Sequence, residues 1–339
     1  MKRPLVFYII SGMLLCAKIY PPFAKVPTTP KILFTSARDG NYEVYSMNPD
    51  GSEQINLTQH LANDLKAVWS PTGEQILFIS DRGGVRDLYL MDPDGSNVRR
   101  VFKRKAKVDR SNPTWSADGK HIAYDNLDWG HPEYGIYITT LGEQEEEFLG
   151  NYSDPAWSPD GTEIACSAAK QGSDWIIFIN VRTRKHERLL PKKALLWQTN
   201  PSWSATGDKL AFTGNRQPLP AILDRDLHNA WADKYTIFIV NRGGTHLKQL
   251  VDEVGPIAWD PALSPNGDEV LYSQEIRKIA QIFKLDVNSG VRTQLTHIGI
   301  PRFGNFGGDW FDPAYALPVS PQPQLLTTTW AEVKKKDDP

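Results

Sequence analysis

Cysteines, catalytic signatures and long apolar runs are all scarce in this sequence, and each shortage narrows what the chain can be. Of the two cysteines, Cys166 sits in an apolar run typical of a core position, and Cys16 lies in a leader-like segment near the start. We therefore expect no intramolecular disulfide in the mature chain. The sequence contains no G-x-S-x-G, H-E-x-x-H or P-loop signature, which argues against the common hydrolases, zinc peptidases and nucleotide-binding enzymes. A net charge of -2 gives no reason to expect a nucleic-acid partner.

An apolar run lies near the start of the chain, at residues 5–17, directly after Lys2 and Arg3. It is shorter than the roughly 20 residues that a membrane-spanning helix needs. A basic start followed by a short apolar stretch is typical of a secretory signal. We therefore predict that residues 1–24 are a signal peptide, with an uncleaved N-terminal anchor as the alternative. The mature protein is then periplasmic or secreted and has no transmembrane domain.

The 11 tryptophans, 25 glycines and 25 prolines are spread along the chain because one short segment recurs. Its clearest copy is DPAWSPDG, which ends at Gly161, and related copies end at Gly73, Gly119, Gly207 and Gly267. A last, partial copy, DPAYALP, spans residues 312–318. The aromatic position of the segment falls at Trp69, Trp115, Trp157, Trp203, Leu263 and Tyr315, so the spacing is 42 to 60 residues. Periods of this size indicate a repeat architecture.

Each copy is followed by the same series of short β-type runs, as in EIACSA and then WIIFIN, separated by loops or by Asp-Gly and Gly-Gly turns. Together with the run around the marker aromatic, this makes four strands per unit, as in a propeller blade. Residues 31–58 supply strands two to four of one blade, and residues 312–318 supply a first strand. Joining the two ends gives an all-β, six-bladed propeller over residues 31–320, followed by a C-terminal tail, 321–339. A strand-like segment at 325–330 is not needed for this closure.

The recurring pattern, aromatic-Ser-Pro-Asp-Gly, then Ile-Ala-Phe-like, then Ile-Tyr-x-Met-Asp-x-Asp-Gly, resembles the WD40-like (PD40) repeat of the TolB family of propellers. The resemblance covers about residues 31–320. It implies the same six-bladed fold and a role as a protein-binding module of the cell envelope, because TolB propellers dock a peptidoglycan-associated lipoprotein. Since one fold hosts many activities, the resemblance is more specific for fold than for function.

The two faces of such a propeller differ in sequence. The turns between strands one and two and between strands three and four share one face, which we call the turn face. The loops between strands two and three share the other, the loop face, with the connectors between blades. Two loops of the loop face are enlarged, at 125–135 and 214–235, and long loops on a rigid scaffold often carry binding sites. The candidate ligand-binding residues in them are Asp128, Trp129, His131, Glu133, Tyr134, Asp224, Arg225, Asp226, His228 and Trp231. The alternative is that these loops are solvated insertions.

Two other features of this face carry charge or hydrogen-bonding groups. An Asx residue precedes the proline of the repeat at Asn112, Asp154, Asn200, Asp260 and Asp312, while Lys66 breaks the series. These residues are explained by a turn that starts the inner strand, or alternatively form a polar rim of the central tunnel that holds a cation or the tip of a partner. The connector at 99–110 has seven basic residues out of twelve and is either solvated or attracts an acidic ligand.

One enzymatic interpretation remains open. The histidines His60, His131, His228 and His297 fall in segments assigned to the loop face, and oligogalacturonate lyases carry similar repeats and a histidine-bound metal. Their spacing specifies no coordination geometry. We therefore expect a monomeric, non-catalytic protein without cofactor or metal; the resemblance to TolB implies that it binds an envelope protein, and carbohydrate is a possible ligand. The alternative is a metal-dependent, carbohydrate-active enzyme.

Overall fold

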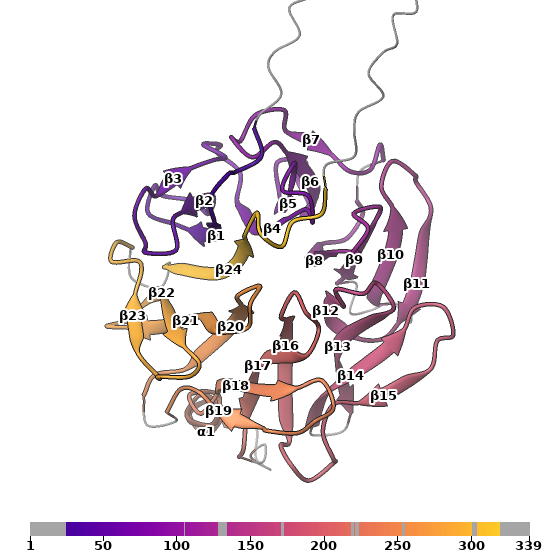
Figure 1. The fold of residues 1–339 in the computed structure, drawn as a ribbon. Helices are drawn as coiled ribbons and strands as arrows, with labels where there is room; N and C mark the ends of the chain where they lie inside the picture. The colour runs from indigo at the N-terminus through magenta and orange to yellow at the C-terminus, as the bar shows by residue number, and fades with distance from the viewer. Residues whose placement is uncertain are drawn as a thin grey trace, which may run out of the picture.

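The computed structural model describes residues 25–318, except 105, 128–133, 171–172, 218–219, 221–223, 253–254 and 300–303. The described residues form six antiparallel blades arranged in a ring (Figure 1). The prediction of an all-β, six-bladed propeller is thereby confirmed. The predicted signal segment at 1–24 and the tail at 321–339, with its strand-like stretch, lie outside the described residues.

Each blade has four strands, and the first of them lies nearest the centre of the ring (Figure 1). Blade 1 contains β24 (Asn305–Phe311), β1 (Lys31–Ser36), β2 (Glu43–Met47) and β3 (Ile55–Asn56). Blade 2 contains β4 (Asp64–Trp69), β5 (Ile76–Ser80), β6 (Asp87–Met91) and β7 (Arg99–Arg100). Blade 3 contains β8 (Arg110–Trp115), β9 (His121–Asn126), β10 (Gly135–Thr140) and β11 (Glu146–Gly150).

The remaining blades follow the same order. Blade 4 contains β12 (Ser153–Trp157), β13 (Glu163–Lys170), β14 (Ser173–Asn180) and β15 (His186–Arg188). Blade 5 contains β16 (Trp197–Trp203), β17 (Lys209–Asn215), β18 (Thr236–Asn241) and β19 (Lys248–Gln249). Blade 6 contains β20 (Ala258–Leu263), β21 (Glu269–Ile276), β22 (Ile279–Asp286) and β23 (Arg292–Gln294). A parallel contact between Asp174 and Trp197 joins blades 4 and 5 into one eight-stranded sheet.

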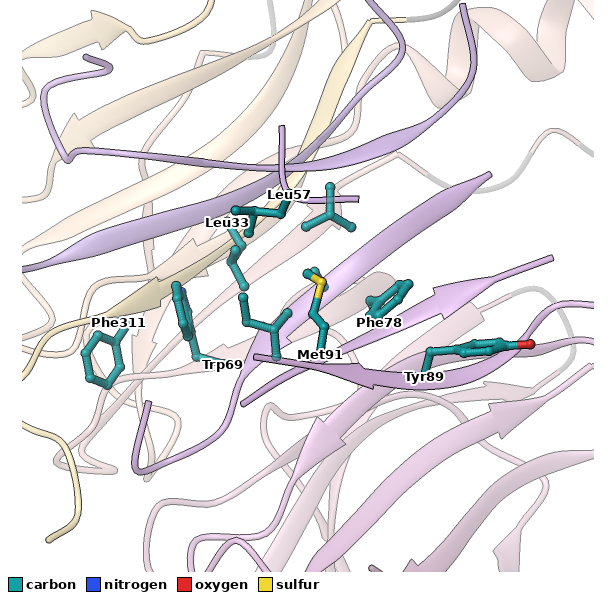
Figure 2. Close-up of a cluster of buried hydrophobic side chains, with 10 residues drawn as sticks. Leu33, Leu57, Trp69, Phe78, Tyr89, Met91 and Phe311 are labelled. Carbon is teal, nitrogen blue, oxygen red and sulfur yellow. The ribbon is translucent and has the colours of Figure 1, made fainter. Parts of the chain in front are cut away.

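The apolar core lies between neighbouring blades. Figure 2 shows one such cluster, in which Leu33 and Leu57 of blade 1 pack with Trp69, Phe78 and Met91 of blade 2. Because each blade buries both of its faces, its middle strands are continuous apolar runs rather than alternating ones. Truncating such a large buried side chain to alanine typically costs about 3–5 kcal/mol.

The recurrent S-P-D-G segment is a tight turn between the first and second strands of a blade. In blade 4, Ser158 donates its backbone N–H to Glu163 O (2.8 Å) and accepts one from Gly161 N (2.9 Å) at its carbonyl. The hydroxyl of Ser158 donates to Asp160 Oδ1 at 2.6 Å. Gly161 has φ of 75°, a left-handed conformation that glycine adopts at little cost. These polar groups are occupied within the turn, so the segment is structural.

The ring closes where β24 pairs with β1, with Lys31 opposite Phe311 and Ser36 opposite Asn305. The prediction that residues 312–318 form the closing strand is therefore wrong, because the strand comes just before them. The aromatic residue of the repeat in this strand is Trp310, whose Nε1 donates to the carbonyl of Ala262 in blade 6 (3.0 Å). Trp203 of blade 5 donates in the same way to Ala156 of blade 4. Tyr315 lies in the turn that follows and is 45% exposed.

One helix, α1 (Arg225–Ala232), interrupts the β pattern in the enlarged loop between β17 and β18. This helix was not among the elements expected from the sequence. The part of the chain that the structure describes has no helix with the length and apolar character needed to cross a membrane.

Candidate functional site

The inner strands carry a repeated irregularity that brings one residue per blade to the central channel. In each blade the register between the inner strand and its neighbour shifts, as at a β-bulge. The residue at the bulge has φ between 44° and 67°. These residues, which we call the channel ring, are Lys66, Asn112, Asp154, Asn200, Asp260 and Gly307. All of them line one cavity of about 130 Å³.

The bulge explains why the sequence has Asx followed by proline at this point. Asn and Asp tolerate the left-handed conformation better than other side chains, and glycine adopts it freely. A bulged residue is left out of the hydrogen-bonded ladder, so proline, which has no N–H, fits beside it. The Asx residues were expected to form a turn that starts the strand, but they lie at a bulge inside the strand.

The structure brings four of the five predicted rim residues together: Asn112, Asp154, Asn200 and Asp260. Asp312 is not among them. It follows the end of β24 and lines a second cavity, of about 350 Å³, between the C-terminal ends of the inner strands near Trp69 and Trp115. Gly307 takes the sixth position of the channel ring, so blade 1 contributes no side chain there.

Lys66 supplies the positive charge of the channel ring. Its ammonium lies 2.8 Å from Asp260 Oδ2, and the two side chains are 25% and 13% exposed. Burial by itself lowers the pKa of Lys66, but the carboxylate of Asp260 outweighs this, so the pKa is raised. Lys66 therefore stays charged and partly neutralises the carboxylates of the ring.

On the opposite side of the ring, an amide joins two acidic side chains. Asn112 Nδ2 donates to Asp125 Oδ2 (2.8 Å) and to Asp154 Oδ1 (3.0 Å), and Asp154 N donates to Asp125 Oδ2 (3.2 Å). Burial raises the pKa of Asp154, opposed by a hydrogen bond from Ser167. Burial, and then the charge of Asp154, raises the pKa of Asp125 well above its usual value. The pair thus shares less negative charge than two free carboxylates would carry.

The channel therefore presents an ammonium, carboxyl groups and amides within one small cavity. Such a set can form hydrogen bonds and ion pairs with a polar tip. Within the described ranges, no three or more His, Cys, Asp or Glu side chains are grouped so that they could hold a metal.

The first enlarged loop is described only in part. Asp128, Trp129, His131 and Glu133 lie outside the described residues. Tyr134, just before β10, is partly buried, and its backbone carbonyl accepts a hydrogen bond from Asn151 Nδ2 at 2.8 Å.

The described part of the second enlarged loop contains α1. Asp224 is its N-cap, since its carboxylate accepts from Asp226 N (2.9 Å) and Leu227 N (3.0 Å), which stabilises the first turn. Asp226 and His228 are exposed, and Arg225 is the first residue of the helix. Asp224 therefore has a structural role, and the outward side of the helix is formed by its neighbours.

Trp231 holds α1 against blade 5. It is 7% exposed, packs edge-on against Trp197 (ring centroids 4.9 Å apart) and Tyr235 (5.2 Å), and donates from Nε1 to Gln217 O at 2.9 Å. His228 lies beside it at 5.5 Å. Trp231 is thus an anchor for the helix and presents little surface to a ligand.

The four histidines considered as metal ligands are not grouped by the described structure. His60 and His297 are exposed in different connectors, and His60 Nδ1 accepts from Ala62 N at 3.0 Å. His228 is on α1, and His131 lies outside the described residues. Asp125 was expected only as the start of an enlarged loop and not as a site residue. The one signal for its role was its place at the end of an apolar strand.

Comparison with known proteins agrees with this architecture. Residues 16–112 and 110–236 match PD40, the TolB beta propeller domain. The Tol-Pal system protein TolB of Francisella tularensis subsp. mediasiatica is 27% identical in an alignment of 208 residues that covers 51% of this chain and 47% of that protein. The TolB of Alcanivorax borkumensis is 40% identical in an alignment of 79 residues that covers 20% of this chain and 18% of that protein. This chain thus matches about half the length of the first of these relatives.

Solved structures show the same fold. The crystal structure of TolB from Acinetobacter baumannii aligns with a TM-score of 0.68 at 19% identity, covering 83% of this chain and 66% of that one. A putative TolB from Agrobacterium tumefaciens aligns with a TM-score of 0.59 at 16% identity, covering 84% and 98% of the two chains. At these identities the likeness concerns the fold. With the family match extending over most of residues 16–236, the chain belongs to the PD40 family of TolB β-propeller domains.

Proposed function

We propose that this protein is a non-catalytic binding module for another protein of the cell envelope, in the periplasm or outside the cell, and that the loop face is its binding surface. Family membership supports a binding role, since the related proteins are components of the Tol-Pal system. The leader predicted at residues 1–24 supports export.

The observation that carries the choice of face is the way α1 is built. Its N-terminus is capped by Asp224, and its buried side is held by Trp231, so the helix is a fixed feature of the loop face. Its exposed side chains include those of Asp226, His228 and Leu227, the last of which is 50% exposed. A fixed element that the described parts of the other blades do not repeat, with an apolar residue flanked by polar ones, is suited to specific recognition.

Site-specific photo-cross-linking in cells tests the proposed face. A photoreactive phenylalanine derivative replaces Leu61 or Leu227 on the loop face, or Val291 in a turn of the turn face as the matched control. These three apolar side chains are 98%, 50% and 63% exposed, so replacing them should leave the fold intact. We expect a discrete protein adduct from Leu61 or Leu227 and none from Val291. Adducts from Val291 alone would place the binding surface on the turn face and contradict the proposal.

Replacement is preferable to deleting the enlarged loop. Removing α1 would uncover Trp197, which packs against Trp231, and loss of binding could then reflect damage to blade 5.

A further inference from the structure

Both faces of the propeller expose charged residues, but they differ in where these residues gather. Exposed acidic residues recur in the tight turns of the turn face at Asp50, Asp94, Asp118, Asp160 and Asp208, and Asp286 is half-buried at the end of β22. Hydrogen bonds from Ser52, Ser96 and Ser289 lower the pKa of Asp50, Asp94 and Asp286, so these groups are negative at neutral pH. Exposed basic residues recur in the loops and connectors of the loop face: Arg86, Lys103, Arg104, Lys107, Lys192 and Lys193. The loop face also exposes acidic residues, among them Asp39, Asp226 and Asp252, so its distinctive feature is the clustering of basic residues.

The densest basic segment is the connector between β7 and β8, and its backbone is fixed to the propeller. Val101, Phe102 and Ala106 are buried at 8%, 3% and 9% exposure. Lys103 N donates to Gln144 Oε1 (2.8 Å), and Ala106 N donates to Asp87 Oδ2 (3.3 Å). The connector therefore holds its outward side chains at defined positions.

The basic residues around this connector divide into two groups. Arg110 forms ion pairs with the buried Asp87 (2.7 Å) and with Glu146 (2.6 Å), and Arg100 also pairs with Asp87 (3.4 Å). These two arginines are part of the fold.

The second group points to solvent and consists of Arg86, Lys103, Arg104 and Lys107, which we call the cationic platform. Arg86 belongs to it because its carbonyl accepts from Arg110 N (3.1 Å) and its N–H donates to Asp109 Oδ1 (3.0 Å), which ties the β5–β6 loop to the connector. Among the described residues, no carboxylate lies within ion-pairing distance of these four side chains.

The chemistry of the cationic platform distinguishes between anionic partners. A protein that inserts into a membrane surface combines basic residues with exposed aromatic or aliphatic ones. Here the connector's Val101, Phe102 and Ala106 are buried, and the exposed side chains among its described residues are all basic. We propose that the cationic platform docks an acidic segment of the partner protein. This proposal rests on the proposed function, because it assigns the chemistry of the partner at the same face.

The test measures binding of a fluorescent oligoglutamate peptide at low salt. The variant Lys103→Glu/Arg104→Glu/Lys107→Glu reverses the platform, and Lys120→Glu/Arg182→Glu/Lys185→Glu reverses three exposed cations on the turn face, with the same change in net charge. We expect the first variant to lose at least about tenfold in affinity and the second to stay within about twofold of wild type. The Lys103→Gln/Arg104→Gln/Lys107→Gln variant should lose an intermediate amount, which shows that charge rather than misfolding is responsible.

Two outcomes would overturn the proposal. Equal losses in the two charge-reversed variants would mean that the peptide senses net charge rather than the platform. Tight binding to phosphatidylglycerol vesicles without measurable binding to oligoglutamate would make the ligand a membrane surface.

A second experiment separates this proposal from the proposed function. If cross-links from Leu61 or Leu227 persist unchanged in the platform-reversed variant, the loop face binds its partner without acidic docking, and the platform proposal fails alone. If wild type gives no cross-links there, the proposed face fails, while the oligoglutamate titration still reports whether the platform selects acidic peptides.

Discussion

Replacing Lys66 with methionine should destabilise the propeller in a pH-dependent manner. Methionine keeps much of the length and apolar stem of lysine but removes the ammonium that lies 2.8 Å from Asp260. The carboxylate of Asp260 then has no cationic partner in the channel ring, and the acidic pair of Asp154 and Asp125 loses the positive charge that opposes the rise in their pKa values.

The size of the effect follows from the burial of the pair. Fully exposed ion pairs contribute up to about 1 kcal/mol, whereas removing one partner of a fully buried pair costs about 3–5 kcal/mol. With side chains 25% and 13% exposed, Lys66 and Asp260 lie between these limits. We expect a loss of about 2 kcal/mol in the free energy of unfolding at pH 7, roughly a 30-fold change in the folding equilibrium.

The pH dependence has a defined sign. Asp125 and Asp154 have raised pKa values in the folded state, so the stability they contribute is present below the unfolded pKa of about 4 and is lost as pH rises through the folded pKa. Without Lys66 their protonation is favoured further. The difference between the variant and wild type should therefore be largest near pH 7 to 8 and shrink towards about pH 5.

Urea unfolding followed by tryptophan fluorescence and circular dichroism measures both quantities. Asp260→Asn and the double variant Lys66→Met/Asp260→Asn complete a double-mutant cycle, in which the double variant should lose less stability than the sum of the single ones. A stability for Lys66→Met within about 0.5 kcal/mol of wild type at pH 7, or a loss that is constant between about pH 5 and 8, would refute the assigned role of the ammonium.

Three further predictions concern single positions. Burial raises the pKa of Asp309 to about 7, so the stability that its protonated form contributes falls as pH rises from the unfolded pKa of about 4 to about 7. Asp309→Asn should flatten this fall in the free energy of unfolding in urea between about pH 4 and 7, and an unchanged slope would count against the prediction. Cys166 is buried, and burial raises the pKa of its thiol. A colourimetric thiol reagent should therefore react with Cys166 in urea but hardly in buffer. Rapid reaction in buffer would instead show that blade 4 opens. Gly307 has φ of 67°, and there is open space where a Cβ would lie. In urea unfolding, Gly307→Asn should lower the free energy of unfolding by about 1 kcal/mol or less, and Gly307→Val should lower it clearly more. Equal losses would argue against the bulge conformation.

The blades could be predicted from the sequence because their signals are local. A turn such as that at Ser158 to Glu163 is closed by hydrogen bonds between residues a few positions apart, and it recurs in the same form. The closing strand was misplaced because blade 1 has Gly307 and Gly308 where the other copies have Asx or Lys, mostly followed by proline, and the next Asp-Pro was taken in their place. Glycine satisfies the backbone requirement of the bulge while erasing its sequence signature.

The channel ring could be anticipated only in part. The Asx residues were identified from the repeat, but the ion pair that balances them joins Lys66 and Asp260, which are 194 positions apart. No local pattern reports such a contact. The helix α1 did have a local signal, since Asp224 followed by an acidic residue in the first turn is a typical N-cap, but the segment was treated only as part of a long loop. Its stability depends on the burial of Trp231, which is a tertiary contact.

The pairing of β1 with β24 also has a consequence for how the protein is made. The ribosome delivers β1 to β3 first, yet the blade that they belong to gains its innermost strand only when the residues of β24 emerge. Until then the nascent chain carries an unpaired strand edge and an incomplete apolar cluster, because Phe311 belongs to the cluster around Trp69. Joining segments so distant in sequence is slow, and exposed edges favour association between chains. Translation that stops before β24 therefore yields an incomplete propeller that is prone to aggregate. Chaperones that bind unpaired strand edges would be needed most during the last part of synthesis.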